Sequence, residues 1–214
     1  MGGVIVSRSA GQPWPDHDGA VRYALDRLAR ELAPHLTYHN LQHTRDDVLP
    51  AAERLAQLRS LVMPDRQLLR VAAAFHDLGH VVDSLDHERI GVASARSVLP
   101  PLGFTDVDLD RIEGMILATR MPQTPLNDEQ SLLVDADLDS LGRDDFLDTS
   151  RALWLERRAL GHDIPWARWL VTQRDFLLRH RYFTDVARAL RDAGKQRNLE
   201  RLERLIHGTG DGAT

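Results

Sequence analysis

Histidine and acidic side chains gather in four short segments of this chain, and any fold that it adopts has to account for them. Five of the ten histidines lie between residues 39 and 87. The segments are Tyr38–His43, His76–His80, His87-Glu88 and Asp135–Asp137. Imidazoles and carboxylates from separate parts of a chain are the usual ligands of hydrolytic divalent metals. The sequence therefore predicts that these segments converge on a metal pocket.

Two histidine pairs, His39/His43 and His76/His80, have i,i+4 spacing. On a helix this spacing places both imidazoles on one face. The neighbours His76 and Asp77 diverge by about 100° on a regular helix, so both can face one metal only near a helix end or at a local distortion. Gly79 is where we expect such an irregularity.

Apolar residues recur at helical spacing along most of the chain, and no convincing run of alternating β-branched residues interrupts them. The run from Val71 to Phe75 is apolar almost all round, which predicts a central, buried helix. We expect an all-α bundle of about eight to ten helices. The expected helical ranges are about 21–32, 36–61 with a kink at Pro50, 65–80, 86–99, 107–119, 128–141, 144–160, 165–180, 182–193 and 195–207, with a break at Gly194.

A length of 214 residues favours one domain. We expect a flexible lead-in over residues 1–15, a helical domain over 16–207 and a disordered Gly-rich tail over 208–214. Within the domain, the motifs occupy about 36–146, and further helices follow over 147–207.

The composition excludes several classes of protein. There are no cysteines, so disulfides, thiolate zinc sites and cysteine nucleophiles are excluded. A formal net charge of −5 argues against binding of a nucleic acid polymer or an acidic membrane surface. No stretch approaches the roughly 20 apolar residues of a membrane span, and no secretory leader is recognised, so we expect a cytoplasmic protein.

The order His…His-Asp…Asp resembles the HD superfamily of metal-dependent phosphohydrolases, which is named for its His-Asp pair. Tyr38–His43 is similar to a segment of the cyclic-nucleotide phosphodiesterases in that superfamily, and Phe75–His80 is similar to their His-Asp-x-x-His segment. The stretch Ile116–Arg143 resembles a subgroup of small HD proteins. The resemblance covers residues of about 36–146 and implies a compact helical domain of the HD type.

Carried over to this chain, the resemblance implies four metal ligands, namely His43, His76, Asp77 and Asp137. Asp77 would bridge the ions if a second one is bound. Asp135 is the alternative to Asp137, because carboxylates two positions apart on a helix face different ways. We choose Asp137, since the ligand in the superfamily usually follows Ala and precedes a hydrophobic residue. The number of ions, one or two, and the choice among Mn, Fe, Zn, Co, Ni and Mg stay open.

The expected chemistry is hydrolysis of a phosphate ester by hydroxide formed on the metal, since a divalent ion lowers the pKa of bound water toward about 7. His39 would donate a proton to the leaving group. His80 would orient the water or hold the substrate phosphate, and Arg120 would clamp phosphate oxygens. His87 would either add a ligand to a second metal or cap the helix that begins near Asp86.

The sequence thus predicts a metal-dependent phosphohydrolase, a phosphomonoesterase or a phosphodiesterase, with a small phosphorylated substrate that resembles a nucleotide. Two alternatives stay open. One is an HD-type di-iron oxygenase that cleaves a C–C or C–P bond with O₂, for which His39, His80 and His87 would be the extra ligands. The other is a non-catalytic nucleotide-sensing module. A homodimer is compatible with the sequence.

Overall fold

The computed structural model describes residues 14–210, and these residues form nine α-helices and no β-strand. The all-α class and the expected number of helices are confirmed. The expected lead-in lies almost wholly outside the described residues, as does the end of the tail, residues 211–214. The helices are α1 His17–Glu31, α2 Leu49–Leu58, α3 Met63–Phe75, α4 His87–Val98, α5 Asp106–Ala118, α6 Asp128–Asp137, α7 Phe146–Ala159, α8 Trp166–Arg179 and α9 Asp185–Gly210.

Several helices begin where a polar side chain satisfies free backbone amides. The Asp16 side chain accepts a hydrogen bond from Gly19 N at the start of α1. Thr105 and Asp108 form a reciprocal capping box at the start of α5, and Asn127 caps α6. Such caps stabilise a helix by about 1 kcal/mol each, and they fix where the helices that carry the motifs begin.

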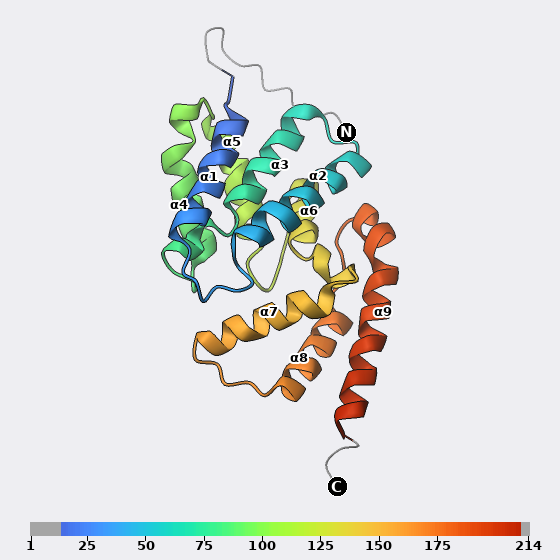
Figure 1. The fold of residues 1–214 in the computed structure, drawn as a ribbon. Coiled ribbons are helices and arrows are strands. Elements are labelled where there is room, and N and C mark those ends of the chain that lie inside the picture. The colour runs from blue at the N-terminus through green and yellow to red at the C-terminus, as the bar shows by residue number, and fades with distance from the viewer. Residues whose placement is uncertain (1–13, 211–214) are drawn as a thin grey trace.

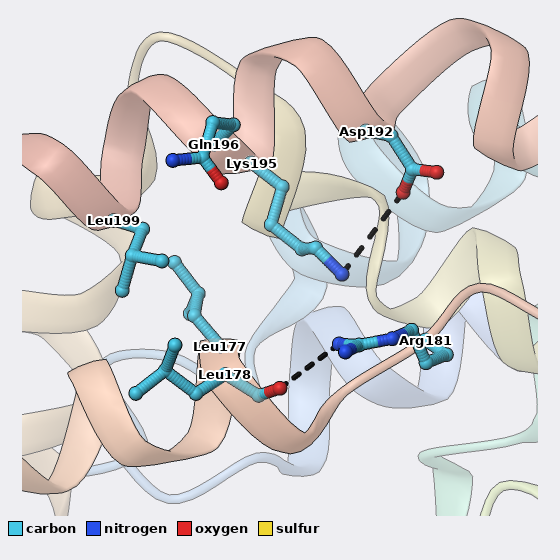
Figure 2. Close-up of a pocket in the computed structure, with 7 residues that line it drawn as sticks. All are labelled: Leu177, Leu178, Arg181, Asp192, Lys195, Gln196 and Leu199. Atoms are coloured by element: carbon cyan, nitrogen blue, oxygen red, sulfur yellow. Dashed lines mark hydrogen bonds and ion pairs between the residues drawn. The ribbon is translucent and has the colours of Figure 1, made fainter.

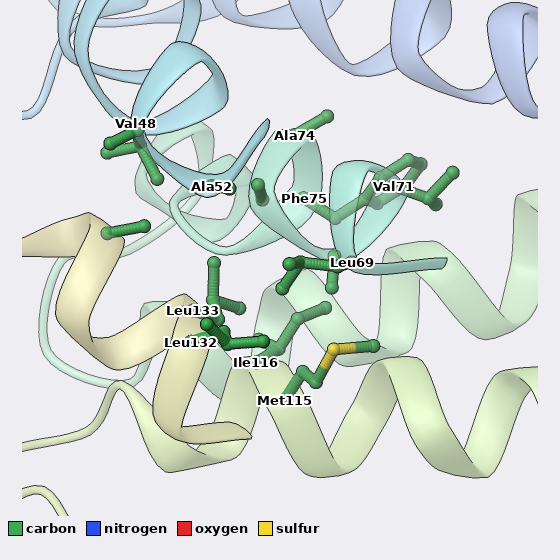
Figure 3. Packing of buried hydrophobic residues seen from close by; sticks show 14 of the residues in the cluster. Val48, Ala52, Leu69, Val71, Ala74, Phe75, Met115, Ile116, Leu132 and Leu133 are labelled. Carbon is green, nitrogen blue, oxygen red and sulfur yellow. The ribbon is translucent and has the colours of Figure 1, made fainter. Parts of the chain in front are cut away.

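Helix α3 lies at the centre of the molecule, as its apolar run predicts. Its residues from Val71 to Phe75 are fully buried. Helices α1, α2, α5 and α6 pack around it, and Figure 3 shows Ala52, Ile116 and Leu133 gathered in this core. The end of α3 is therefore held firmly, and His76 and Asp77 follow at that end.

Helices α7, α8 and α9 form a second layer beside this core (Figure 1). Two buried carboxylates attach it. Asp135 accepts hydrogen bonds from the backbone amides of Phe183 and Thr184, both at 2.8 Å. Asp139 binds the guanidinium of Arg191 at 2.6 and 2.8 Å. Charge-assisted bonds of this kind are strong when buried, so the layer is fixed against the core.

The structure corrects several expected helices, and two corrections concern residues 36–61 and Gly194. The expected helix over 36–61 does not begin at Leu36: residues 37–40 are bends, a π-helical segment spans His43–Val48, and α2 follows from Leu49. The expected break at Gly194 is wrong, because α9 runs without interruption to Gly210, into the expected tail. Gly194 instead lies against Gly142, where a Cβ atom would overlap the backbone. Its role is close packing rather than helix termination.

None of the helices in the described part of the chain combines the length and the apolar character that crossing a membrane requires.

Candidate metal centre

The backbone changes conformation where the His-Asp pair lies. Helix α3 ends at Phe75, Asp77 leaves helical geometry with φ −102° and ψ 4°, and a 3₁₀ turn spans Leu78–Val81. The irregularity expected near Gly79 is confirmed, and a Cβ atom on this glycine would overlap the backbone of His87. The change of direction lets His76 and Asp77 face the same space although they are neighbours. The expectation that His76 and His80 share a face of one helix is wrong.

Four side chains meet in a first group, which consists of His43, His76, Asp77 and Asp137. His43 Nε2 lies 3.2 Å from Asp137 Oδ1 and 3.6 Å from Asp77 Oδ2. His76 Nε2 lies 3.2 Å from Asp77 Oδ2 and 3.6 Å from Asp137 Oδ1. The π-helical segment carries His43, and the last residue of α6 is Asp137. The four predicted ligands therefore lie together.

The polar atoms of this first group fit a bound cation. His76 Nδ1 donates to Ala73 O at 2.8 Å, which leaves Nε2 to face the two carboxylates. His76 Nε2 and Asp77 Oδ2 are both buried without a hydrogen-bond partner. Buried polar atoms rarely lack partners unless an ion or a ligand satisfies them. Imidazole nitrogens with carboxylate oxygens suit Zn, Mn, Fe or Co.

A second group lies on the other oxygen of Asp77. His80 Nε2 lies 3.8 Å and His87 Nε2 3.6 Å from Asp77 Oδ1. Ser84 holds both rings from behind: its hydroxyl is 3.0 Å from His80 Nδ1, and its carbonyl accepts a hydrogen bond of 3.1 Å from His87 Nδ1. His80 Nε2 is another buried atom without a partner. Glu88 is buried beside this group, with Oε1 3.4 Å from His87 Nε2.

The charges of the cluster are strongly coupled. Burial alone would raise the pKa of Asp77, but the imidazole of His76 outweighs it and lowers that pKa well below its ordinary value. The pKa of Asp137 is lowered in the same way by His43 and His76. Burial lowers the pKa of His80 to about 3, so this imidazole is neutral at pH 7. The same carboxylates outweigh burial and raise the pKa of His76 well above its ordinary value, so a metal ion that bound here would displace the proton of His76.

His39 lies in the bend before the π-helical segment, so the expectation that it shares a helix face with His43 is wrong. Its ring stacks on His80 with centroids 4.5 Å apart. One of its nitrogens lies within 4.8 Å of ligand atoms of Asp77 and His80. Burial opposes a charge on His39, but contact with Glu156 and the negative charge of Asp77 outweigh it and raise the pKa of His39.

The remaining predicted residues lie outside these groups. Asp135 points away from the cluster and accepts hydrogen bonds from the amides of Phe183 and Thr184, directly before α9. Arg120 is half-exposed, and its guanidinium lies 3.7 Å from a carboxylate oxygen of Asp86, the residue before His87. It is therefore near the start of α4, which carries His87, but not within the cluster.

Sequence reasoning missed several residues that contact the cluster, among them Ser84 and Glu156. Ser84 holds His80 and His87, and Glu156 on α7 contacts His39. Neither residue lies in a recognisable motif. The only sequence signal for Ser84 is its position between the two histidines, and Glu156 is separated from His39 by 117 residues without any signal.

A pocket of about 270 Å³ lies elsewhere, between α8 and α9 (Figure 2). Its two cations, Arg181 and Lys195, do not form an anion site. Arg181 donates to the carbonyl oxygens of Leu178 and His180, at the end of α8. Lys195 donates to His180 O at 2.8 Å and lies 4.0 Å from Asp192. Both cations thus bind carbonyl oxygens at the carboxyl end of α8, where positive charge is stabilising.

A family model described as the HD domain matches residues 26–141. This span is more than half of the chain, so the protein belongs to the HD domain family. A comparison with curated proteins finds no match.

Two crystal structures share the fold. One is a predicted HD superfamily hydrolase from an uncultured Thermotogales bacterium, with a TM-score of 0.59 and 20% identity over 91% of this chain and 93% of that one. The other is YpgQ of Bacillus subtilis in complex with ADP, with a TM-score of 0.60 and 21% identity over 88% of this chain and 96% of that one. At these identities the two structures establish a shared HD-type fold.

Proposed function

We propose that the protein is a metal-dependent phosphohydrolase that cleaves a phosphate ester of a nucleotide or of another small phosphorylated metabolite. The observation that carries this proposal is the position of Asp77. One of its oxygens faces His43 and His76, and the other faces His80 and His87.

The first ion would be held by His43, His76, Asp77 and Asp137. A second would be held by the other oxygen of Asp77 with His80 and His87, whose Nδ1 atoms are already engaged by Ser84. Bound divalent ions would neutralise charge on a phosphoryl oxygen and make water more acidic. If only one ion binds, His80 Nε2 is free to contact the substrate phosphate.

The chain has a candidate proton donor beside this cluster. The raised pKa of His39 favours its protonated form, and the ring lies at the edge of the second group. We infer that His39 protonates the leaving-group oxygen, a step that contributes about 10²–10⁴-fold to such reactions. We also propose that Arg120 contacts the phosphate beside the site, after it has released its partner Asp86.

A nucleotide is the substrate class that we favour. YpgQ, which has the same fold, was crystallised with ADP, and the matched HD domain includes every proposed metal ligand. The HD-type di-iron oxygenase remains the alternative, since the second group would also hold iron.

A screen of defined metal forms tests the proposal. Protein freed of metal and reloaded separately with Mn²⁺, Mg²⁺, Co²⁺, Ni²⁺, Zn²⁺ or Fe²⁺ would be assayed with nucleotides, cyclic nucleotides and simple phosphomonoesters. We expect phosphate or nucleoside monophosphate release with at least one ion, and loss of that activity in His76→Ala. No turnover in any combination would contradict the proposal, and O₂-dependent turnover by a two-iron form would establish the oxygenase instead.

A further inference from the structure

Glu156 is a buried acid that lies outside the matched HD domain yet reaches the candidate site. It is on α7, in the second helical layer, and only 2% exposed. Its Oε2 accepts hydrogen bonds of 2.9 Å from the backbone amides of Tyr38 and His39. Its Oε1 contacts His39 Nδ1. One carboxylate therefore holds both the backbone and the ring of His39.

Helix α7 makes a second contact with the same segment. The Thr37 hydroxyl donates to Ala152 O at 2.7 Å, one helical turn before Glu156. Residues 37–40 are bends, so their amides have no helical partners of their own. Buried amides need acceptors, and Glu156 on α7 is the acceptor for the amides of Tyr38 and His39. The position of His39 thus depends on a helix that follows the HD domain in the sequence.

The contact with Glu156 also determines which nitrogen of His39 can act. An ionised carboxylate only accepts hydrogen bonds, so His39 Nδ1 must carry a proton. Nε2 is then the nitrogen that is free to hold a second proton and to release it. A carboxylate that fixes the tautomer of a catalytic histidine is a strong positioning device, since the wrong tautomer cannot exchange the required proton.

We propose that Glu156 is a positioning residue, which orients His39 with Nδ1 protonated and Nε2 toward the scissile ester. The second helical layer thereby completes the active site. This inference rests on the proposed phosphohydrolase function and on the role of His39 as proton donor. An alternative role for Glu156 would be to fix the 37–40 segment without any effect on proton transfer.

Glu156→Gln separates these roles. The amide oxygen can still accept a hydrogen bond from a backbone amide, but the NH₂ group would donate to His39 Nδ1 and so favour the other tautomer. The full-length, metal-loaded variant would be compared with wild type on aryl phosphates whose phenols differ in acidity. Glu203→Gln, an exposed change on α9, is the matched control.

The expected result depends on the leaving group. A poor leaving group needs the proton from His39, so its turnover should fall by about 10²-fold or more. Turnover of p-nitrophenyl phosphate, whose leaving group needs little protonation, should fall by less than about threefold, with KM and metal content unchanged. An equal loss on every ester would show a structural role alone and overturn the inference.

A second measurement does not depend on activity. Nitrogen-15 NMR of the Zn²⁺-loaded protein, with His39→Gln to assign the signals, reports which ring nitrogen carries the proton. We expect a protonated Nδ1 in wild type, and a neutral ring with the proton on Nε2 in Glu156→Gln. A wild-type ring without a proton on Nδ1 would refute the inference, even if the variant failed to fold. Failure of the proposed function would appear differently, as absence of phosphate-ester turnover in wild type.

Discussion

His43 Nε2 and Asp137 Oδ1 lie 3.2 Å apart, although 94 residues separate the two side chains in the sequence. Two residues before Asp137, the carboxylate of Asp135 instead accepts a hydrogen bond from the amide of Thr184, directly before α9. The two acids provide a matched pair, because they share a helix and differ in what they contact.

Asp137→Asn should remove metal and leave the fold intact. The change weakens one anionic ligand and keeps the volume of the side chain, so we expect metal affinity to fall by at least about 10–100-fold, the loss typical of changes to groups that merely support a ligand. Metal content after dialysis, measured by mass spectrometry, checks this expectation. Retention of wild-type metal content would show that Asp137 is not a ligand.

Asp135→Ala should show the opposite behaviour. It leaves the amides of Phe183 and Thr184 without their acceptor, and unsatisfied buried donors cost about 1–3 kcal/mol. The midpoint of urea unfolding should therefore fall, while the metal content of the folded protein stays at the wild-type value. Loss of metal without loss of stability would mean that the roles of the two acids are exchanged.

His39→Ala should retain metal and lose turnover. The ring stacks on His80, but its Nδ1 contacts Glu156 and not the first group of ligands. Without its proton donor the reaction should slow by about 10²–10⁴-fold. Activity and metal content would be measured on the same sample, and a parallel loss of metal would identify His39 as a ligand.

Gly194→Ala should destabilise the attachment of α9. The added methyl group would overlap the backbone of Gly142, which cannot rotate away as a side chain can. Overpacking of this kind costs about 1–3 kcal/mol. Gly208→Ala on the same helix is the control, because nothing lies within 4 Å of its Cβ position, and the better helix propensity of Ala should stabilise it slightly. The midpoint of thermal unfolding would be measured for both variants. Equal shifts in the two midpoints would contradict close packing of Gly194 against Gly142.

His180 should make the metal-free protein less stable in acid. Burial, with repulsion from Lys195 and Arg181, lowers its pKa from 6.5 to about 4. Between these values the unfolded chain binds a proton that the native state does not, so stability is present above pH 6.5 and is lost toward pH 4.

The measurement is urea unfolding at pH 7 and pH 5 in the presence of a chelator. The decrease in unfolding free energy between the two pH values should be smaller in His180→Gln than in wild type. An identical decrease in both proteins would show that His180 has an ordinary pKa in the folded state.

The sequence predicted the helical class, the buried centre around Val71–Phe75 and the meeting of His43, His76, Asp77 and Asp137. These succeed because apolar periodicity reports burial, and because ligand types in a fixed order are informative even when distant. The two i,i+4 pairs led to a wrong prediction of shared helix faces, since neither pair lies on a regular helix. His39 precedes the helical residues that contain His43, and His80 follows the end of α3.

The contribution of the second layer could not be predicted. A glutamate on an amphipathic helix looks the same whether it faces water or a distant histidine, so nothing distinguishes Glu156 before the helices are packed. The prediction of a helix break at Gly194 was wrong for a related reason. Glycine ends many helices, but it also permits close contact, and only the position of Gly142 shows which applies.

The most direct test of the metal site is anomalous X-ray scattering from a crystal of the Mn²⁺-loaded protein. We predict an anomalous peak within coordination distance of His43, His76, Asp77 and Asp137. If two ions bind, a second peak should lie between Asp77, His80 and His87. A map without any peak at Asp77, from protein that demonstrably retains manganese, would contradict the metal site on which the proposed hydrolysis depends.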